Sequence, residues 1–376
     1  MDNRIWTYQH RTKFVFGRGA LDRLTEEAAP LGAGRPMIVC GRSAMRETGI
    51  LDRVNSLLGG NAVVFDSIPA NPSHEIVDEG REICDKEHCD LVVGLGGGSA
   101  IDSAKAISIM TAHEGSVREY LEMKKGFIRP GIPIIAVPTT SGTGTEANPY
   151  FVIVVKDLEA KLSGAPIWTY PAVSILDPEL VVHLPWRQTA STGLDVLAHA
   201  MEALWARPAS PVTDLTAFEA IKLTLEWLPA AVEDGKSLLA RENMMYACLM
   251  SALSLCATRT AAAHGVSYPL TVRWGLEHGF ACAMTLPEFL ELAWEAMGPE
   301  RTGRLIAALG AEGKNDCVEK LRKFCVRMGA PTSLSSIGVK PDDIEHIIEI
   351  ANYKNIGNTI VDVSREKIAE ILKKKL

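Results

Sequence analysis

Short apolar runs alternate with helix-like stretches through the first half of the chain, and this alternation limits the possible folds more than any other feature. The runs lie at 36–40, 62–65, 90–94 and 132–137, and the helical patterns between them lie near 43–58, 74–88 and 99–112. Val-rich and Ile-rich strands separated by helices are typical of a parallel sheet covered by helices on both faces. Residues 1–184 therefore predict an α/β domain.

The pattern changes after about residue 185. Long helical patterns follow with almost no alternating strands, at 189–205, 210–228, 240–263, 285–297, 300–312, 315–328, 341–352 and 364–375. Residues 185–376 therefore predict an all-helical domain, and a length of 376 residues is compatible with two domains.

The composition argues against several classes of protein. The net charge is −7 and no basic tract is present, which argues against a nucleic-acid partner. The apolar run at 132–138 is too short to span a membrane, and the first residues do not resemble a signal peptide. Eight Cys without a CxxC pair are typical of reduced thiols. These features predict a cytoplasmic protein without a membrane partner.

Two glycine-containing loops each follow a predicted strand. Gly96-Gly97-Gly98-Ser99 opens a helix, whose free N–H groups and positive dipole end can bind a pyrophosphate. This loop is not the GxGxxG fingerprint and falls late in the domain, so an ordinary Rossmann first turn is not expected. The second loop, Pro138–Glu146, offers hydroxyls suited to a ribose or a nicotinamide amide. The alternative for both loops is a plain turn.

Asp195 and His199 lie four positions apart in an apolar, helix-favouring stretch, and His264 and His278 follow farther along the chain. Residues four apart share one face of a helix, so this carboxylate and imidazole can converge on one ion. One oxygen ligand and three imidazoles suit Zn(II) or Fe(II) better than Ca or Mg. Such polar pairs are also common on helices that bind nothing, which is the alternative.

Taken together, these motifs resemble the iron-dependent, group III alcohol dehydrogenases, whose superfamily also includes glycerol dehydrogenase and dehydroquinate synthase. The matching motifs span nearly the whole chain: Phe16–Ala20, Asn71-Pro72, Gly96–Ser99 with Asp102 and Lys105, Pro138–Glu146, Lys161, Asp177-Pro178, Gly193 with Asp195 and His199, His264, and His278-Gly279. The resemblance implies a dehydroquinate synthase-like, Rossmann-type α/β domain that binds NAD(P), followed by an all-helical metal-binding domain.

The resemblance also implies an activity and roles for residues. The expected reaction is the reversible, metal-dependent reduction of a small aldehyde to a primary alcohol by NAD(P)H, in a homo-oligomer, most simply a dimer. Asp195, His199, His264 and His278 would hold Fe(II) or Zn(II). The cofactor would be bound by Gly96, Gly97, Gly98 and Ser99 at the pyrophosphate, by Thr139, Thr140 and Thr143 near the ribose and nicotinamide, and by Asn71, Asp102 and Lys161.

One departure from the family concerns the proton donor. Many members carry a further His four residues after the third ligand, where it is discussed as a proton relay, and here the position is Tyr268. A tyrosine hydroxyl can donate a proton, but its ordinary pKa of about 10 makes it a different acid. The alternative is a packed Tyr without a catalytic role.

A second departure concerns the cofactor. NAD-preferring members often place an Asp just after the strand that corresponds to residues 37–40, whereas here Gly41, Arg42 and Ser43 follow. The loss of a carboxylate and the gain of a guanidinium and a hydroxyl favour a 2′-phosphate. The sequence therefore predicts NADP(H) over NAD(H). A solvated Arg42 is the alternative.

The substrate prediction depends on residues 260–286, which resemble the branch of the family that reduces phosphonoacetaldehyde. An anionic aldehyde needs a nearby cation, and Arg259 and Arg273 flank the ligand segment. Sulfoacetaldehyde, a semialdehyde and a neutral short-chain aldehyde remain alternatives. A dehydroquinate synthase-like lyase and a non-enzymatic metal-binding protein are alternatives from other classes.

Overall fold

The computed structural model describes residues 5–376, and the chain divides into two compact units. The sheet unit contains His10–Thr140 and Thr145–Leu184. The helical unit contains Pro185–Leu376 with Ser141–Gly144 and a short stretch that ends at Gln9. The domain boundary predicted after residue 184 stays a prediction.

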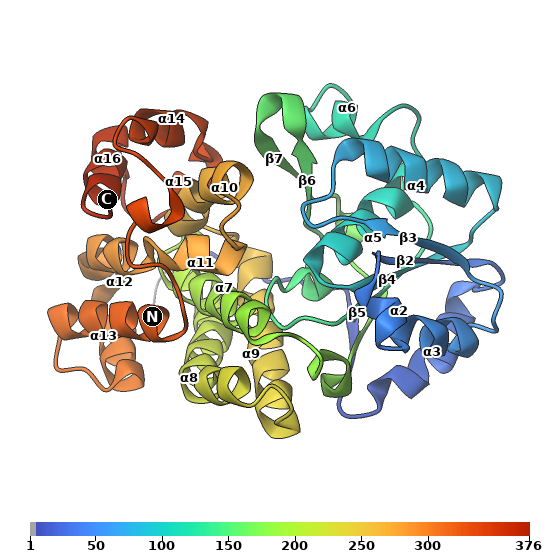
Figure 1. The fold of residues 1–376 in the computed structure, drawn as a ribbon, viewed down its shortest axis with the longest axis horizontal. Helices are drawn as coiled ribbons and strands as arrows, with labels where there is room; N and C mark the ends of the chain where they lie inside the picture. The colour runs from blue at the N-terminus through green and yellow to red at the C-terminus, as the bar shows by residue number, and fades with distance from the viewer. Residues whose placement is uncertain (1–4) are drawn as a thin grey trace. The chain divides into compact units, whose positions relative to one another are not determined.

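A parallel sheet forms the centre of the sheet unit (Figure 1), with the strand order β1-β8-β5-β4-β2-β3. Its strands are β1 (Lys13–Phe16), β2 (Pro36–Gly41), β3 (Val63–Ile68), β4 (Leu91–Gly96), β5 (Ile134–Pro138) and β8 (Val173–Leu176). The predicted α/β class with a parallel sheet is confirmed, and the predicted apolar runs correspond to β2, β3, β4 and β5. The sequence reading missed β1 and β8, which have four residues each and therefore show little periodicity.

Both faces of this sheet are covered by helices. Successive residues of β2 alternate between two cores: Ile38 packs with Leu51 of α3 on one face, and Val39 packs with Val77 of α4 on the other. The helices are α1 (Leu24–Ala28), α2 (Ala44–Glu47), α3 (Ile50–Leu57), α4 (His74–Lys86), α5 (Gly98–Met110) and α6 (Val117–Leu121). An antiparallel pair of strands, β6 (Phe151–Val155) and β7 (Ala160–Gly164), completes the unit.

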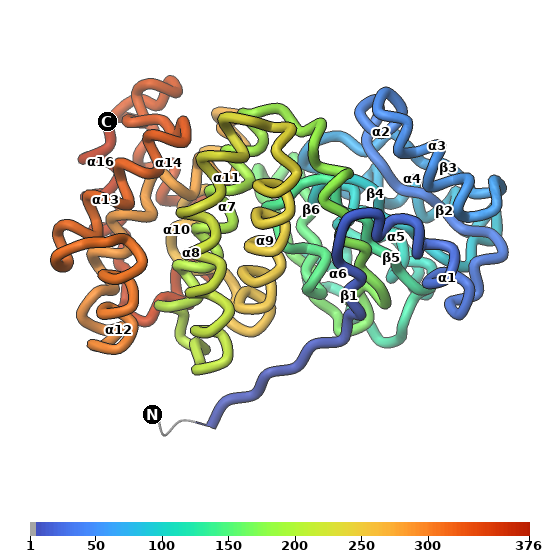
Figure 2. Tube along the Cα trace, turned by 90° about the horizontal axis from the view of Figure 1, so that it is seen from below, coloured from blue at the N-terminus to red at the C-terminus, as the bar shows by residue number. Residues whose placement is uncertain are grey.

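The helical unit contains the long helices expected from the sequence. They are α7 (Trp186–Leu204), α8 (Pro211–Glu233), α9 (Leu238–Thr258), α10 (Ala262–Trp274), α11 (His278–Ala283), α12 (Leu286–Leu309), α13 (Lys314–Arg327), α14 (Asp343–Ile350), α15 (Tyr353–Ile356) and α16 (Arg365–Lys373). Helix α8 packs against both α7 and α9, which lie close together in Figure 2, and their small and apolar side chains form one core. Within residues 5–376, no helix combines the length and the hydropathy that a membrane span requires.

Four predicted helices have different boundaries in the structure. The helix expected over 43–58 is divided at Gly49, which has a positive φ of 74°. The helices expected over 285–297 and 300–312 are joined in α12 across a kink at Gly298. The helix expected over 240–263 is wrong at its end, because α9 stops at Thr258 and α10 starts at Ala262. This last break separates His264 from α9.

Short 3-10 helices connect these elements in the described chain. They are η1 (Ala20–Arg23), η2 (Ala29–Leu31), η3 (Thr145–Ala147), η4 (Lys156–Leu158), η5 (Ile167–Thr169), η6 (Pro178–Val181) and η7 (Ser335–Ile337). The buried carboxylate of Asp177 accepts hydrogen bonds from the backbone of Gly19, Leu21 and Glu179. It thereby holds the start of η1 against the start of η6.

Candidate metal centre and nucleotide-binding loops

Three predicted imidazole ligands of the helical unit lie close to one carboxylate oxygen, that of Asp195. The Oδ1 atom of Asp195 lies 3.8 Å from Nε2 of His199, 3.3 Å from Nε2 of His264 and 3.8 Å from Nε2 of His278. Ligand atoms that share a tetrahedral ion at bond lengths of about 2.1 Å lie about 3.4 Å apart. The distances from Asp195 to the three imidazoles are therefore compatible with one shared cation.

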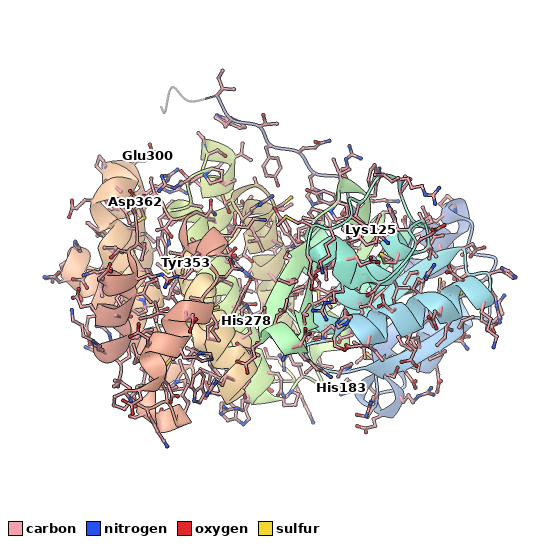
Figure 3. The ribbon with its side chains drawn as sticks, turned by 90° about the horizontal axis from the view of Figure 1, so that it is seen from above. Lys125, His183, His278, Glu300, Tyr353 and Asp362 are labelled. Atoms are coloured by element: carbon pink, nitrogen blue, oxygen red, sulfur yellow. The ribbon has the colours of Figure 1, made fainter. Side chains whose placement is uncertain are left out.

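Local packing brings these side chains together from three helices. Asp195 and His199 lie one turn apart on α7, His264 lies in the first turn of α10, and His278 begins α11 (labelled in Figure 3). Gly279 follows His278, and a Cβ atom at this position would lie 1.7 Å from the carbonyl oxygen of Ser191 in α7. Only glycine allows α11 to approach α7 closely enough for His278 to meet Asp195.

The burial of the cluster fits a bound cation. The side chains of Asp195, His199 and His264 are at most 6% exposed, whereas that of His278 is 31% exposed. Among the described residues, Asp195 Oδ1 and His264 Nε2 have no hydrogen-bond partner. Leaving a buried polar group unsatisfied costs about 1–3 kcal/mol, so these atoms favour an additional ligand.

The charges of the cluster also suit a cation. Burial alone would raise the pKa of Asp195, but the imidazoles of His199, His278 and His264 hold this pKa below its ordinary value. Burial lowers the pKa of His199 to about 4, against the opposing effect of Asp195. At neutral pH the carboxylate is therefore ionised and the His199 imidazole is neutral, and both are in the form that binds a metal.

Glu202 supports the cluster and was not identified from the sequence. It is fully buried on α7, and its carboxylate accepts hydrogen bonds from His264 Nδ1 at 2.7 Å and from the backbone N–H groups of Ala261 and Ala263 at 2.6 Å each. Glu202 is seven residues after Asp195, so both lie on one face of α7. This spacing is the sequence signal from which Glu202 could have been identified. A carboxylate behind a ligating His fixes the tautomer and the ring orientation.

Cys282 is a second neighbour that was not identified from the sequence. Its Sγ atom and the ligand atoms of Asp195, His264 and His278 all lie within 4.8 Å of one another. Cys282 is four residues after His278 on α11, the same spacing that joins Asp195 to His199. Burial raises the pKa of this thiol, so Cys282 is a neutral neighbour of the cluster at physiological pH.

Tyr268 lies beside the cluster, whereas Arg273 is placed differently. The ring centroid of Tyr268 is 5.8 Å from that of His278, and its hydroxyl accepts a hydrogen bond from Asn355 Nδ2 at 3.3 Å. Burial raises the pKa of Tyr268, so the hydroxyl keeps its proton at neutral pH.

Arg273 is exposed in the last turn of α10 with its guanidinium 5.4 Å from the ring of Trp274. Arg259 lies instead between α9 and α10.

The predicted pyrophosphate loop gathers with other candidate residues at the carboxyl ends of β4 and β5. Gly96 has a positive φ of 142°, and the chain then enters α5 at Gly98. The backbone N–H of Thr139 donates to the Gly96 carbonyl at 2.9 Å, and a Cβ atom at Gly97 would lie 3.2 Å from Thr140 Cγ2. The N–H of Asn71 donates to the Ser99 hydroxyl. The start of α5 is thus a free helix N-terminus in a polar setting, as an anion requires.

The strand order supports the same location for a nucleotide. The chain runs outward from β2 to β3 and then returns to the other side of β2 to form β4. Ligands of open α/β sheets bind where the strand order reverses, at the carboxyl ends of the strands. Gly41 ends β2 at this position, and the exposed residues Arg42 and Ser43 follow it.

Three other predicted cofactor residues lie away from the start of α5 or make structural contacts there: Asp102, Thr143 and Lys161. The Asp102 carboxylate accepts hydrogen bonds from Thr145 Oγ1 at 2.6 Å and from the backbone N–H of Val152 at 2.9 Å, so it joins α5 to η3 and to β6. Lys161 lies on β7. Thr143 belongs to the Ser141–Gly144 segment of the helical unit, unlike Thr139 and Thr140. Roles of these residues in cofactor binding stay predictions.

Comparison with known proteins gives consistent matches over nearly the whole chain. Residues 11–178 match the family model for iron-containing alcohol dehydrogenase, and residues 189–376 match the model for the C-terminal part of the Fe-containing alcohol dehydrogenase family. Choline dehydrogenase of Bacillus subtilis (strain 168) is 34% identical over 92% of this chain and 88% of its own length.

Two further matches are named for anionic substrates, whereas choline is a cation. 4-Hydroxybutyrate dehydrogenase of Cupriavidus necator is 32% identical over 88% of this chain and 89% of its own. The crystal structure of sulfoacetaldehyde reductase from Bifidobacterium kashiwanohense in complex with NAD+ is 29% identical, with a TM-score of 0.93 over 99% of each chain.

Proposed function

This chain belongs to the iron-containing alcohol dehydrogenase family, and we propose that it uses NAD(P)H to reduce a small aldehyde to a primary alcohol, reversibly, at the cluster of Asp195, His199, His264 and His278. The observation that carries this proposal is the position of three imidazole Nε2 atoms within 3.8 Å of one buried carboxylate oxygen. We propose Fe(II) or Zn(II) as the bound ion, since both accept this donor set.

A bound divalent ion supplies Lewis acidity toward an aldehyde oxygen, and a bound nicotinamide supplies hydride. The protein contributes the positions of its own groups. Glu202 accepts a hydrogen bond from His264 Nδ1 and so keeps Nε2 directed at the cluster. His278, the most exposed member, marks the side from which a substrate enters. Tyr268, beside His278, keeps its proton and is the proposed donor to the product oxygen.

The finer properties are proposed on the following grounds. NADP(H) is favoured over NAD(H) because Arg42 and Ser43 are exposed after β2 and no carboxylate occupies position 41. An anionic aldehyde such as phosphonoacetaldehyde is favoured by Arg259 and by the resemblance of residues 260–286. The sulfonate and carboxylate in the names of two similar proteins support the anionic class, whereas choline is a cation. We further propose a cytoplasmic homodimer.

The decisive experiment is a panel of aldehydes assayed with NADPH and NADH after reconstitution with Fe(II) or Zn(II). The panel contains phosphonoacetaldehyde, sulfoacetaldehyde, a four-carbon semialdehyde and propanal. Net loss of absorbance at 340 nm with any aldehyde, abolished by Asp195→Ala, supports the reductase. No net consumption of either cofactor would instead favour a dehydroquinate synthase-like lyase, which uses NAD without net turnover.

A further inference from the structure

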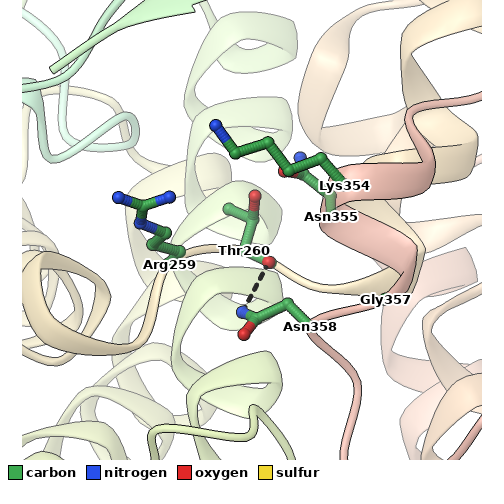
Figure 4. Close-up of a pocket in the computed structure, with 6 residues that line it drawn as sticks. All are labelled: Arg259, Thr260, Lys354, Asn355, Gly357 and Asn358. Carbon is green, nitrogen blue, oxygen red and sulfur yellow. Dashed lines mark hydrogen bonds between the residues drawn. The ribbon is translucent and has the colours of Figure 1, made fainter.

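A pocket of about 200 Å³ lies in the helical unit between α15 and the connection from α9 to α10, and none of its residues belongs to the metal cluster. It is lined by Arg259, Thr260, Lys354, Asn355, Gly357 and Asn358 (Figure 4). We propose that this pocket binds the anionic group of the substrate, with Arg259 and Lys354 as its two cations. The proposal rests on the proposed reductase function and specifies its substrate class as short aldehydes that carry a phosphonate, sulfonate or carboxylate.

The chemistry of the lining favours an anion. Arg259 belongs to the connection between α9 and α10, and Lys354 belongs to α15. Figure 4 shows the nitrogen atoms of both side chains on the same side of Thr260. The other described lining residues offer a hydroxyl, two amides and glycine backbone, and none of them is acidic. A guanidinium binds an oxyanion through two parallel hydrogen bonds, and an ammonium adds a point charge. The chain carries a net charge of −7, so an anionic substrate depends on local cations of this kind.

The backbone at Arg259 is a second, independent observation. Arg259 has φ 60° and ψ 178°, a conformation that is almost restricted to glycine. Asn358 Nδ2 holds it by donating to the carbonyl groups on both sides, at 2.8 Å to Thr258 and 3.0 Å to Thr260. A strained residue that surrounding groups hold in place is typical of ligand-binding loops. Here the strained backbone sets the point from which the Arg259 side chain extends.

The pocket connects to the metal cluster through Tyr268. Asn355 lines the pocket and donates to the Tyr268 hydroxyl, and the Tyr268 ring lies next to that of His278. Gly265 allows this contact, since a Cβ atom there would lie 2.9 Å from the Asn352 carbonyl at the start of α15. One aromatic side chain therefore separates the anion pocket from the cluster. The proposed anion site therefore lies on the side of the cluster that Tyr268 and His278 occupy.

The first test compares anionic and neutral aldehydes in matched variants. Lys354→Met and Arg259→Met should each lower kcat/KM for sulfoacetaldehyde and phosphonoacetaldehyde about tenfold to a hundredfold, mainly through KM. The value for propanal should stay within about twofold, since a neutral aldehyde has no group for the pocket. Lys222→Met removes an exposed lysine of α8 in the same unit and should leave all substrates unchanged. Equal losses on anionic and neutral aldehydes, or no loss on either, would overturn the proposal.

The second test measures binding without turnover. Phosphonoacetate, an unreactive anion of the same class, should bind the metal-loaded protein in calorimetry, and Lys354→Met should weaken this binding at least tenfold. If the protein reduces propanal but phosphonoacetate binding does not depend on Lys354, the pocket assignment fails and the reductase stands. If Lys354-dependent binding is present but no aldehyde is reduced, the reductase fails and the pocket stands.

Discussion

Glu202 connects the proposed metal cluster to the backbone at the start of α10. Its carboxylate orients His264 and also accepts the N–H groups of Ala261 and Ala263. We expect Glu202→Gln to lower the affinity for Zn(II) about tenfold to a hundredfold, because the neutral amide holds the His264 tautomer less firmly. Competition with a chelator measures this affinity, and Glu226→Gln, at an exposed position of α8, is the matched control. Equal affinities in the two variants would assign Glu202 a purely structural role.

Tyr268 allows a direct test of proton donation. Its hydroxyl is hydrogen-bonded to Asn355 and its ring lies against His278, so Tyr268→Phe keeps the packing and removes only the acid. If the hydroxyl delivers the proton, kcat should fall about a hundredfold, while binding of the metal stays unchanged. Steady-state rates with propanal provide the measurement. An unchanged kcat would leave solvent as the proton source and Tyr268 as a packing residue.

The sequence predicts the four residues of the cluster better than the side chain that supports them. Asp195 and His199 have a helical spacing, and His264 and His278 offer imidazole nitrogens, which suit Zn(II) and Fe(II). All four could therefore be proposed as ligands. Glu202 was missed because an acidic residue on a helix is usually an exposed one. Its burial depends on the N–H groups of a connection nearly sixty residues later, which no local pattern reveals.

Among the elements, the break between α9 and α10 shows where tertiary contacts override local propensity. Residues 255–263 favour a helix in isolation, and the sequence predicts one helix through 263. In the structure, Asn358 binds the carbonyls of Thr258 and Thr260, and Glu202 binds the N–H groups that begin α10. These two side chains, remote in sequence, end one helix and start the next.

The strained junction predicts a gain in stability when Arg259 is replaced by glycine. A non-glycine residue at φ 60° and ψ 178° costs about 1–3 kcal/mol, and glycine loses about 0.4–1 kcal/mol through the greater freedom of its unfolded chain. Arg259→Gly should therefore stabilise the helical unit by about 1 kcal/mol, whereas Arg259→Ala keeps the strain and gains nothing. Thermal denaturation of the metal-free variants measures the difference. A glycine variant no more stable than the alanine variant would show that the junction is not strained.

For the molecule as a whole, the alternation of strands and helices predicts the class of each unit but not the strand order. The order β1-β8-β5-β4-β2-β3 depends on which strands meet in space, and β1 and β8 are neighbours although about 160 residues separate them (Lys13 pairs with Val173). The sequence therefore predicts that a nucleotide loop follows β4, while the position of this loop beside the end of β2 follows only from the topology. From that adjacency we propose that the residues after β2 influence the choice of cofactor.

The last prediction concerns that choice. Because β2 and β4 are neighbours where the strand order reverses, a nucleotide whose pyrophosphate lies at the start of α5 places its ribose near Gly41, Arg42 and Ser43. Asp66, on the adjacent strand β3, forms an ion pair with Arg46, which reduces the repulsion between its carboxylate and a 2′-phosphate.

We expect kcat/KM to be higher with NADPH than with NADH, and Arg42→Ala to lower the NADPH value about tenfold while the NADH value stays unchanged. Arg11→Ala, at another exposed arginine of the sheet unit, should change neither value. Equal losses with both cofactors in Arg42→Ala would place the contact at a group they share, such as the pyrophosphate, and equal wild-type values would contradict the preference itself.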